Sequence, residues 1–171
     1  MRLTKGIILI TLIFQTYGCG QNEDIVSLIS QGDLKKIESY IVQKNINLNE
    51  KVHGILPIYS ALSSANCDTE ILSVLVRHGA NINLALDNLN GNALSLALFN
   101  GSEECILAAI DYGVDVNVVD MNGYNVMHLA VIREDLSEEV LAKLFAKSPS
   151  LILAQSNLYE IPLDLAVKAN N

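Results

Sequence analysis

The chain has 171 residues, of which half are apolar, 5% are aromatic and none is Trp. It carries 11 basic and 19 acidic residues, which gives a formal net charge of −8 at pH 7 with His neutral. A chain this acidic lacks the basic face that phosphate backbones require, so nucleic acid is excluded as a partner class. We expect a single domain at this length.

The N-terminal segment reads "MRLTKGIILITLIFQTYGCG", with two basic residues ahead of an uncharged apolar run from Gly6 to Phe14. A positive start followed by a short apolar stretch is typical of a secretory signal, and the run is too short for an ordinary membrane-spanning helix. Cys19 directly follows the small residue Gly18. This arrangement resembles the lipoprotein box of bacterial lipoproteins.

The resemblance implies that the peptide is cut before Cys19, whose sulfur and new amino group are then acylated. We therefore expect a signal peptide over residues 1–18 and a lipidated tether over 19–23, facing the periplasm. Because Gly20 follows the cysteine instead of an Asp retention signal, the outer membrane is the expected address in an enterobacterial-type host. A plain signal peptide or an uncleaved anchor, with Cys19 incidental, is the alternative.

Without residues 1–18 the chain loses two basic residues, Arg2 and Lys5, which leaves 9 basic against 19 acidic residues and a net charge near −10. An anionic membrane surface would repel such a chain, so we expect membrane attachment to come from the lipid. A basic protein partner would be attracted.

The remainder of the chain repeats. Residues 51–61, 87–97, 120–130 and 156–166 read "KVHGILPIYSA", "DNLNGNALSLA", "DMNGYNVMHLA" and "SNLYEIPLDLA", and they start 36, 33 and 36 residues apart. Each copy passes from a polar turn into an apolar pattern with helical spacing. A repeat array is therefore predicted.

A second helix is predicted in the units at 69–83, "TEILSVLVRHGANIN", and 103–117, "EECILAAIDYGVDVN". Both segments have apolar residues at helical spacing and close on Asn after a short extended stretch. Gly79 and Gly113 stand where these helices would end, and they suit a left-handed C-cap that a residue with a Cβ adopts at a cost. Residues 32–49 are a degenerate copy of this second helix.

At this point the pattern resembles the ankyrin repeat, whose unit is a β-turn, a "TPLHxA" helix, a second helix and a "GADVN" return. The matching stretches are "LPIYSA", "NALSLA", "NVMHLA" and "IPLDLA". The resemblance implies an all-α repeat solenoid of helix-turn-helix units with β-hairpin tips. The expected ankyrin-repeat domain covers residues 24–171, with repeats at about 24–50, 51–86, 87–119, 120–155 and 156–171.

Three features depart from the family pattern. Asn90 and Tyr159 stand where the turn Gly is expected, and "KSPSLIL" at 147–153 replaces the Gly-containing return of the fourth unit. The hairpins at these places therefore depart from the consensus turn.

Two cysteines remain if Cys19 carries lipid. Cys105 aligns with Ile71, an apolar position of the second helix, so we expect it to behave as a small buried hydrophobe. A bridge from Cys105 to Cys67 of the neighbouring repeat is conceivable in an oxidising compartment, but the spacing alone does not place the two Cα atoms within reach. No Cys/His spacing for a metal is present, and we expect no metal or cofactor.

The chain has three histidines, His53, His78 and His128. His128 occupies the His of the "TPLH" motif, which in the family ties down the turn by hydrogen bonding. His78 precedes a helix end, where a cation suits the helix dipole. Because no nucleophile elbow, phosphate loop or HExxH motif is present either, we expect no enzymatic activity.

The resemblance also implies where a partner binds, namely the hairpin tips and the concave face of the first helices. At many of the positions that the scaffold leaves free this chain is apolar, and a contiguous exposed apolar patch usually marks an interaction site. Alternatively, these residues fold back onto neighbouring hairpins, or the degenerate repeats drift in register. The predicted partner-binding residues are Val52, His53, Ile55, Leu89, Phe99, Met121, Asn122, Tyr124, Ile132, Arg133 and Leu158.

Four of these residues, Phe99, Met121, Tyr124 and Ile132, are predicted to lie side by side in the middle of the concave face. Tyr124 is the expected main anchor, because it can bury a ring and still offer a hydroxyl. We expect neither Tyr124 nor Phe99 to belong to the stacking core.

Together these patterns predict a lipid-anchored module of the cell envelope that binds another protein and is a monomer when unbound. Small ankyrin lipoproteins resemble the immunity proteins encoded with phospholipase effectors of type VI secretion. That resemblance implies a toxin or effector as the partner. The alternative is an envelope structural or chaperone-like factor that supports a periplasmic enzyme or assembly.

Overall fold

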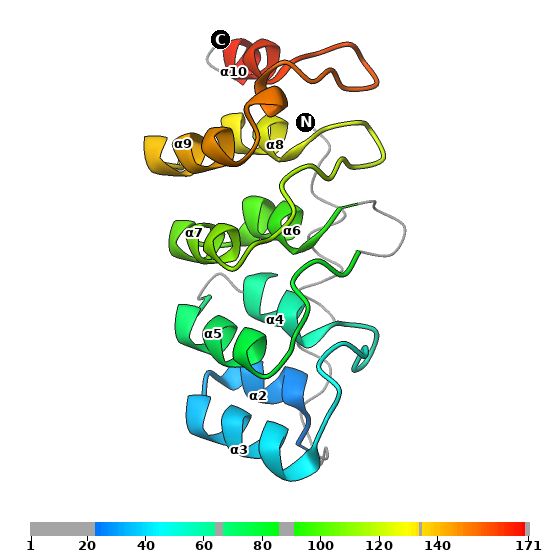
Figure 1. Ribbon diagram of the computed structural model, residues 1–171, viewed down its shortest axis with the longest axis vertical. Coiled ribbons are helices and arrows are strands. Elements are labelled where there is room, and N and C mark those ends of the chain that lie inside the picture. The colour runs from blue at the N-terminus through cyan, green and yellow to red at the C-terminus, as the bar shows by residue number, and fades with distance from the viewer. Residues whose placement is uncertain (1–22, 64–66, 86–90, 134, 170–171) are drawn as a thin grey trace.

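The computed structural model describes residues 23–63, 67–85, 91–133 and 135–169. In these ranges the chain forms short helices that stack in two layers, and the array runs from α2 at one end to α10 at the other (Figure 1). Among the described residues, β-structure is limited to isolated antiparallel bridges at two hairpins. The expected all-α repeat solenoid is confirmed.

The helices alternate between the two layers along the chain. The layer next to the hairpins holds α2 (Ile25–Gln31), α4 (Pro57–Ser63), α6 (Ala93–Asn100), α8 (Val126–Val131) and α10 (Pro162–Ala169). The outer layer holds α3 (Leu34–Lys44), α5 (Thr69–Arg77), α7 (Glu103–Asp111) and α9 (Glu138–Lys147), and the short 3-10 helix η1 (Pro149–Ile152) follows α9.

Local sequence explains where these helices begin and end. Asn92 and Asn125 each accept hydrogen bonds from two backbone N–H groups at the start of α6 and α8, which satisfies donors that have no partner inside the helix. Gly79 and Gly113, just beyond α5 and α7, have φ of 92° and 80° as the sequence predicted. A side chain at either glycine would be strained in that conformation.

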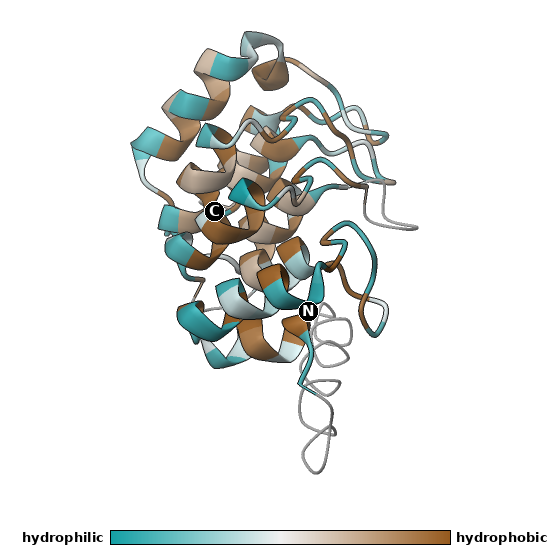
Figure 2. Ribbon diagram, turned by 60° about the horizontal axis from the view of Figure 1, so that its bottom comes forward, coloured by the Kyte–Doolittle hydropathy of each residue, from teal (hydrophilic) through white to brown (hydrophobic). Residues whose placement is uncertain are grey.

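The core lies between the two layers, where Figure 2 shows hydrophobic residues on the facing sides of the helices, while the hairpins carry both hydrophilic and hydrophobic residues. Leu75 of α5 and Ala109 of α7, which align in adjacent units, are both fully buried. Leu94 of α6 and Leu144 of α9 are also inaccessible to solvent. Each fully buried leucine stabilises the fold by roughly 1.5–3 kcal/mol.

An asparagine ladder joins the first three units. Asn49 accepts a hydrogen bond from Asn81 N at 2.7 Å and donates one to Gly79 O at 2.9 Å. One unit further, Asn83 accepts from Asp115 N at 2.7 Å and donates to Gly113 O at 3.2 Å. The side chain of the asparagine that ends one return therefore forms hydrogen bonds with two backbone groups of the next return.

The fourth unit has no glycine return, and η1 takes its place. In the third unit the cap residue Asn92 donates to Asp115 O at 2.7 Å, and in the fourth unit Asn125 donates to Leu151 O, within η1, at 2.9 Å. The cap asparagine therefore donates to a backbone carbonyl in both units, although the accepting segment is the extended return in the third unit and η1 in the fourth. At the last hairpin, Tyr159 adopts φ 61° where the preceding unit has a glycine.

Cys67 and Cys105 form a disulfide with their Cα atoms 6.2 Å apart. Cys67 lies just before α5 and Cys105 in the first turn of α7, so the bond joins two adjacent units. The sequence had left this pairing open. Among the described helices, none is both long and apolar enough to span a membrane.

Candidate partner-binding surface

The fourth hairpin is held by its own aspartate. Asp120 Oδ1 accepts hydrogen bonds from Asn122 N at 2.8 Å and from Tyr124 N at 2.9 Å, and Gly123 provides the positive φ of 76° that the turn requires. This geometry projects Met121 and Asn122 from the tip, where both are exposed.

The fifth hairpin stacks on the fourth. Asn157 donates its backbone N–H to Asn122 O at 2.9 Å and its side-chain amide to Met121 O at 3.0 Å. Leu158, the next residue, is exposed. Met121 and Leu158 therefore stand on neighbouring tips and form an exposed apolar pair, which we call the hairpin-tip group.

Phe99 and Ile132 form a second exposed apolar pair, which we call the helix-end group. Phe99 lies in the last turn of α6 and is 61% exposed, while Ile132 is the exposed C-cap of α8, and these two helices pack together. The four residues that were predicted to lie side by side are therefore found in two separate places. Phe99 and Ile132 lie at the C-terminal ends of the helices, whereas Met121 and Tyr124 precede the start of α8.

Tyr124 is half-buried and connects two units. Its hydroxyl donates to a carboxylate oxygen of Glu160 at 3.0 Å, and its ring centroid lies 5.3 Å from that of His128. Lys168 binds the other oxygen of the same carboxylate. The hydrogen bond to Glu160 raises the pKa of the Tyr124 hydroxyl. The expectation that Tyr124 stands outside the packing was wrong, because this side chain packs against the core.

His128 also connects the fourth and fifth units, through a buried contact. It is fully buried, and its Nε2 lies 2.9 Å from the carbonyl oxygen of Glu160. A carbonyl only accepts, so Nε2 donates in this contact. On the other side of the ring, Nδ1 lies 3.2 Å from Asn125 N and 2.9 Å from Asn125 Oδ1. His128 therefore ties down the turn, as in the family pattern.

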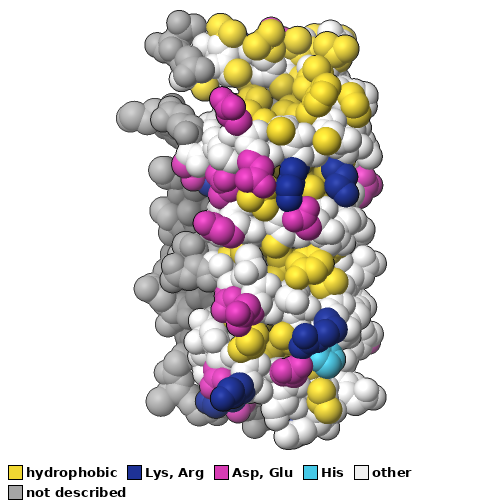
Figure 3. Space-filling model, turned by 60° about the vertical axis from the view of Figure 1, so that its left-hand side comes forward, with side chains coloured by type: hydrophobic (Ala, Val, Ile, Leu, Met, Phe, Trp, Pro, Cys, Tyr) yellow, Lys and Arg dark blue, Asp and Glu magenta, His cyan; other side chains and the backbone are white. Residues whose placement is uncertain are grey.

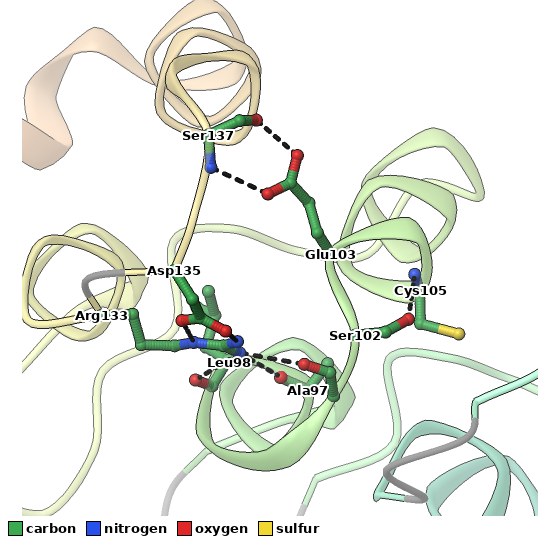
Figure 4. Close-up of polar contacts among 9 residues, drawn as sticks. Ala97, Leu98, Ser102, Glu103, Cys105, Arg133, Asp135 and Ser137 are labelled. Atoms are coloured by element: carbon green, nitrogen blue, oxygen red, sulfur yellow. Dashed lines mark hydrogen bonds and ion pairs between the residues drawn. The ribbon is translucent and has the colours of Figure 1, made fainter.

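Arg133 is turned inward (Figure 4). Its Nη1 donates to the carbonyl oxygens of Ala97, Leu98 and Gly101 at 3.4, 3.2 and 3.0 Å, at the C-terminal end of α6. Its guanidinium also pairs with Asp135, and this interaction lowers the pKa of the Asp135 carboxyl. A cation at the negative end of a helix is stabilising there. We therefore remove Arg133 from the candidate surface.

A carboxylate of α7 supports the next outer helix beside Arg133. Glu103 Oε2 accepts a hydrogen bond from Ser137 N at 2.8 Å, and its other oxygen accepts from the Ser137 hydroxyl. Ser137 is the N-cap of α9. Figure 4 shows these contacts bridging the third and fourth units.

Two of the predicted partner-binding residues of the second unit are only partly exposed. Val52 and Ile55 form a one-pair antiparallel bridge, with N–O distances of 2.9 and 3.0 Å, and both are half-buried against the core. His53 is exposed at the turn between them and lies 3.1 Å from Asp24 Oδ2. Leu89 and the predicted lipidation site Cys19 lie outside the described residues.

Sequence reasoning missed several exposed apolar residues near the C-terminal end of the array. Tyr159 is 81% exposed beside Leu158, and Leu163 of α10 is 64% exposed. Tyr159 occupies a position that normally holds Gly, which is the one sequence signal that pointed there. Across the described part of the chain, the structure shows no group of three or more His, Cys, Asp or Glu that could hold a metal ion.

Comparison with known proteins agrees with this geometry. A family profile described as "Ankyrin repeats (3 copies)" matches residues 16–120 and again 58–153. An ankyrin repeat protein of Fowlpox virus (strain NVSL) is 26% identical over 137 residues, which are 77% of this chain and 40% of that relative. The chain belongs to the ankyrin-repeat family. It spans well under two thirds of the viral relative's length.

Ankyrin repeats are protein–protein interaction modules, and proteins built from them are generally non-enzymatic. The surface described above is therefore a candidate for binding a protein partner. Its exposed apolar members are the hairpin-tip group and the helix-end group.

Proposed function

We propose that this protein is a lipid-anchored, periplasm-facing immunity protein that binds and neutralises a secreted toxin of the phospholipase type. The observation that carries the proposal is the presence of two exposed apolar groups on an acidic array, one at the hairpin tips and one at the C-terminal ends of α6 and α8. A surface of this composition suits a partner with an apolar patch and a basic surround. The proposed module has no catalytic activity of its own.

The two groups are separated along the array's inner layer. The hairpin-tip group precedes α8 and the helix-end group includes its C-cap, so at least the length of α8, which has 6 residues, or about 9 Å of helix, lies between Met121 and Ile132. Binding energy in protein interfaces concentrates in a few large side chains. Phe99 and Met121 are the strongest candidates, because they are large, exposed and come from adjacent units.

The disulfide supports the proposal that the protein is exported to the periplasm. A bond between Cys67 and Cys105 persists in oxidising compartments and is rare where thiols are kept reduced. Export also agrees with the signal-like segment and the lipoprotein-box resemblance at Cys19. Lipid on Cys19 would hold the module at the membrane, where a phospholipase acts.

The proposal is tested by a protection assay in a strain that is sensitive to a periplasmic phospholipase effector encoded beside this gene. The wild type should protect, whereas Phe99→Asp combined with Met121→Asp should reach the envelope in equal amount and fail to protect. Val42→Asp, an exposed change on α3, is the matched control and should protect. Equal protection by all three proteins would contradict the assignment of the surface.

A protein that never protects would contradict the immunity role itself. Capture of an envelope enzyme or assembly factor in place of a toxin would then favour the alternative of a structural or chaperone-like factor. The two results are distinguishable, because the second still requires Phe99 and Met121 for capture.

A further inference from the structure

The last helix exposes residues that the other units bury. Leu163 is 64% exposed, although the three residues at the equivalent position of the preceding units are at most 4% exposed. Those three residues are Ile58, Leu94 and Met127. Val167 is 54% exposed, whereas its equivalents Leu62 and Leu98 are buried and Val131 is half-buried. In each preceding unit an outer helix packs on the inner one, and α10 has no such helix among the described residues.

This exposure extends beyond α10. The helix packs beside η1, at whose end Ile152 and Leu153 are exposed, and the ion pair of Lys168 with Glu160 holds the last hairpin next to α10. Figure 3 shows hydrophobic side chains gathered over this end of the molecule, with charged side chains concentrated over the units below. The C-terminal end face, as we call it, comprises Ile152, Leu153, Tyr159, Leu163 and Val167.

The end face is almost uncharged. Between residues 148 and 169 the chain carries only Glu160, Asp164 and Lys168, a net charge of −1, although the chain as a whole is strongly acidic. Glu160 is paired with Lys168, and Asp164 Oδ2 accepts a hydrogen bond from Ile161 N at 2.9 Å. A charged partner would find no complementary charge here. Two copies of the chain, however, can approach through this end with less repulsion than through any acidic side.

The opposite end of the array has different chemistry. A shallow hollow on α3 is lined by polar and charged side chains that include Lys35, Lys36, Ser39 and Gln43. Head-to-tail stacking would cover these groups with an apolar face and leave them without partners. A pairing that joins two identical end faces about a two-fold axis avoids this cost.

We propose that the C-terminal end face is the interface of a tail-to-tail homodimer, in which α10 packs against α10 of a second copy. A stable interface buries about 800 Å² on each partner, and the exposed parts of five large side chains contribute a large part of such an area. The pairing goes beyond the toxin-binding proposal, because it uses the end of the array and leaves the hairpin-tip and helix-end groups open. It replaces the expectation of a monomer, which took no account of this face.

Site-specific photo-crosslinking of the full chain in cells tests the pairing. Leu163→p-benzoylphenylalanine should give, on irradiation, a product of twice the chain mass that contains two differently tagged copies of the protein. The same photo-reactive residue at Val42, exposed at the opposite end on α3, should give no such product. Mass spectrometry identifies what is crosslinked in each case.

A second measurement uses copurification of the two tagged copies. Leu163→Glu combined with Val167→Glu should reduce it at least tenfold, while Phe99→Asp should leave it unchanged. The proposal is overturned if Leu163 crosslinks a different protein or nothing, or if the double variant still copurifies. Loss of toxin protection with the dimer intact would count against the proposed function and not against the pairing.

Discussion

Tyr124 of the fourth unit donates its hydroxyl hydrogen bond to Glu160 of the fifth, at 3.0 Å. This contact makes a residue that the sequence had assigned to a partner part of the array's own structure. Removing the hydroxyl by Tyr124→Phe should lower the unfolding free energy by about 1 kcal/mol. Tyr124→Ala also removes the half-buried ring and should cost more, about 3 kcal/mol. Urea denaturation measures both, and equal stability of all three proteins would refute the structural role.

The Glu160 carboxylate gives the array a sensitivity to acid. Hydrogen bonds from Lys168 and then from Tyr124 lower its pKa below the usual 4.5. A group with a depressed pKa contributes stability that is complete above the unfolded value and is lost as pH falls through the folded value. Melting temperatures of the wild type and Glu160→Gln should therefore differ at pH 7 and converge below pH 4.5. A constant difference down to pH 2 would contradict this assignment.

Reduction of the disulfide should weaken the middle of the array. Cys67 and Cys105 are 38 residues apart in sequence, and the chain-entropy treatment of such a loop gives about 4 kcal/mol. Dithiothreitol should lower the melting temperature of the wild type and leave that of Cys67→Ser with Cys105→Ser unchanged. Free-thiol titration of the protein isolated from cells provides the control, since export predicts that both thiols are oxidised.

Lipidation of Cys19 is tested by metabolic labelling with a fatty-acid analogue. Label should be incorporated into the wild type and be absent from Cys19→Ala. As a matched control, Cys67→Ser removes a cysteine without touching the lipoprotein box, so that variant should remain labelled. Undiminished label in Cys19→Ala would show that this residue is not the anchor.

The helices and their ends could be predicted because their signals are local. Apolar spacing indicates the buried faces of α5 and α7, and Gly79 and Gly113 indicate where these helices stop. The asparagine cap of α8 is likewise visible in "NVMHLA". Each of these features depends on residues a few positions apart, which is the range that sequence periodicity reports.

The contacts between units could not be predicted in the same way. Arg133 binds three backbone carbonyls, which leave no signature in the sequence. The approach of Cys67 to Cys105 depends on how two units stack. Leu163 has the residue type of a core position, and only the array shows that no outer helix among the described residues covers it. These three features share one cause, because each depends on how neighbouring units stack.

The central claim is that the exposed apolar groups bind a protein partner. Its most direct measurement is a quantitative pull-down from envelope extract with wild type, Phe99→Asp plus Met121→Asp, and Val42→Asp, each checked by circular dichroism. Loss of two hot-spot side chains should raise the dissociation constant at least about 30-fold, equivalent to about 2 kcal/mol, while Val42→Asp binds like wild type. A folded double variant that retains the same partner with wild-type affinity would contradict the claim.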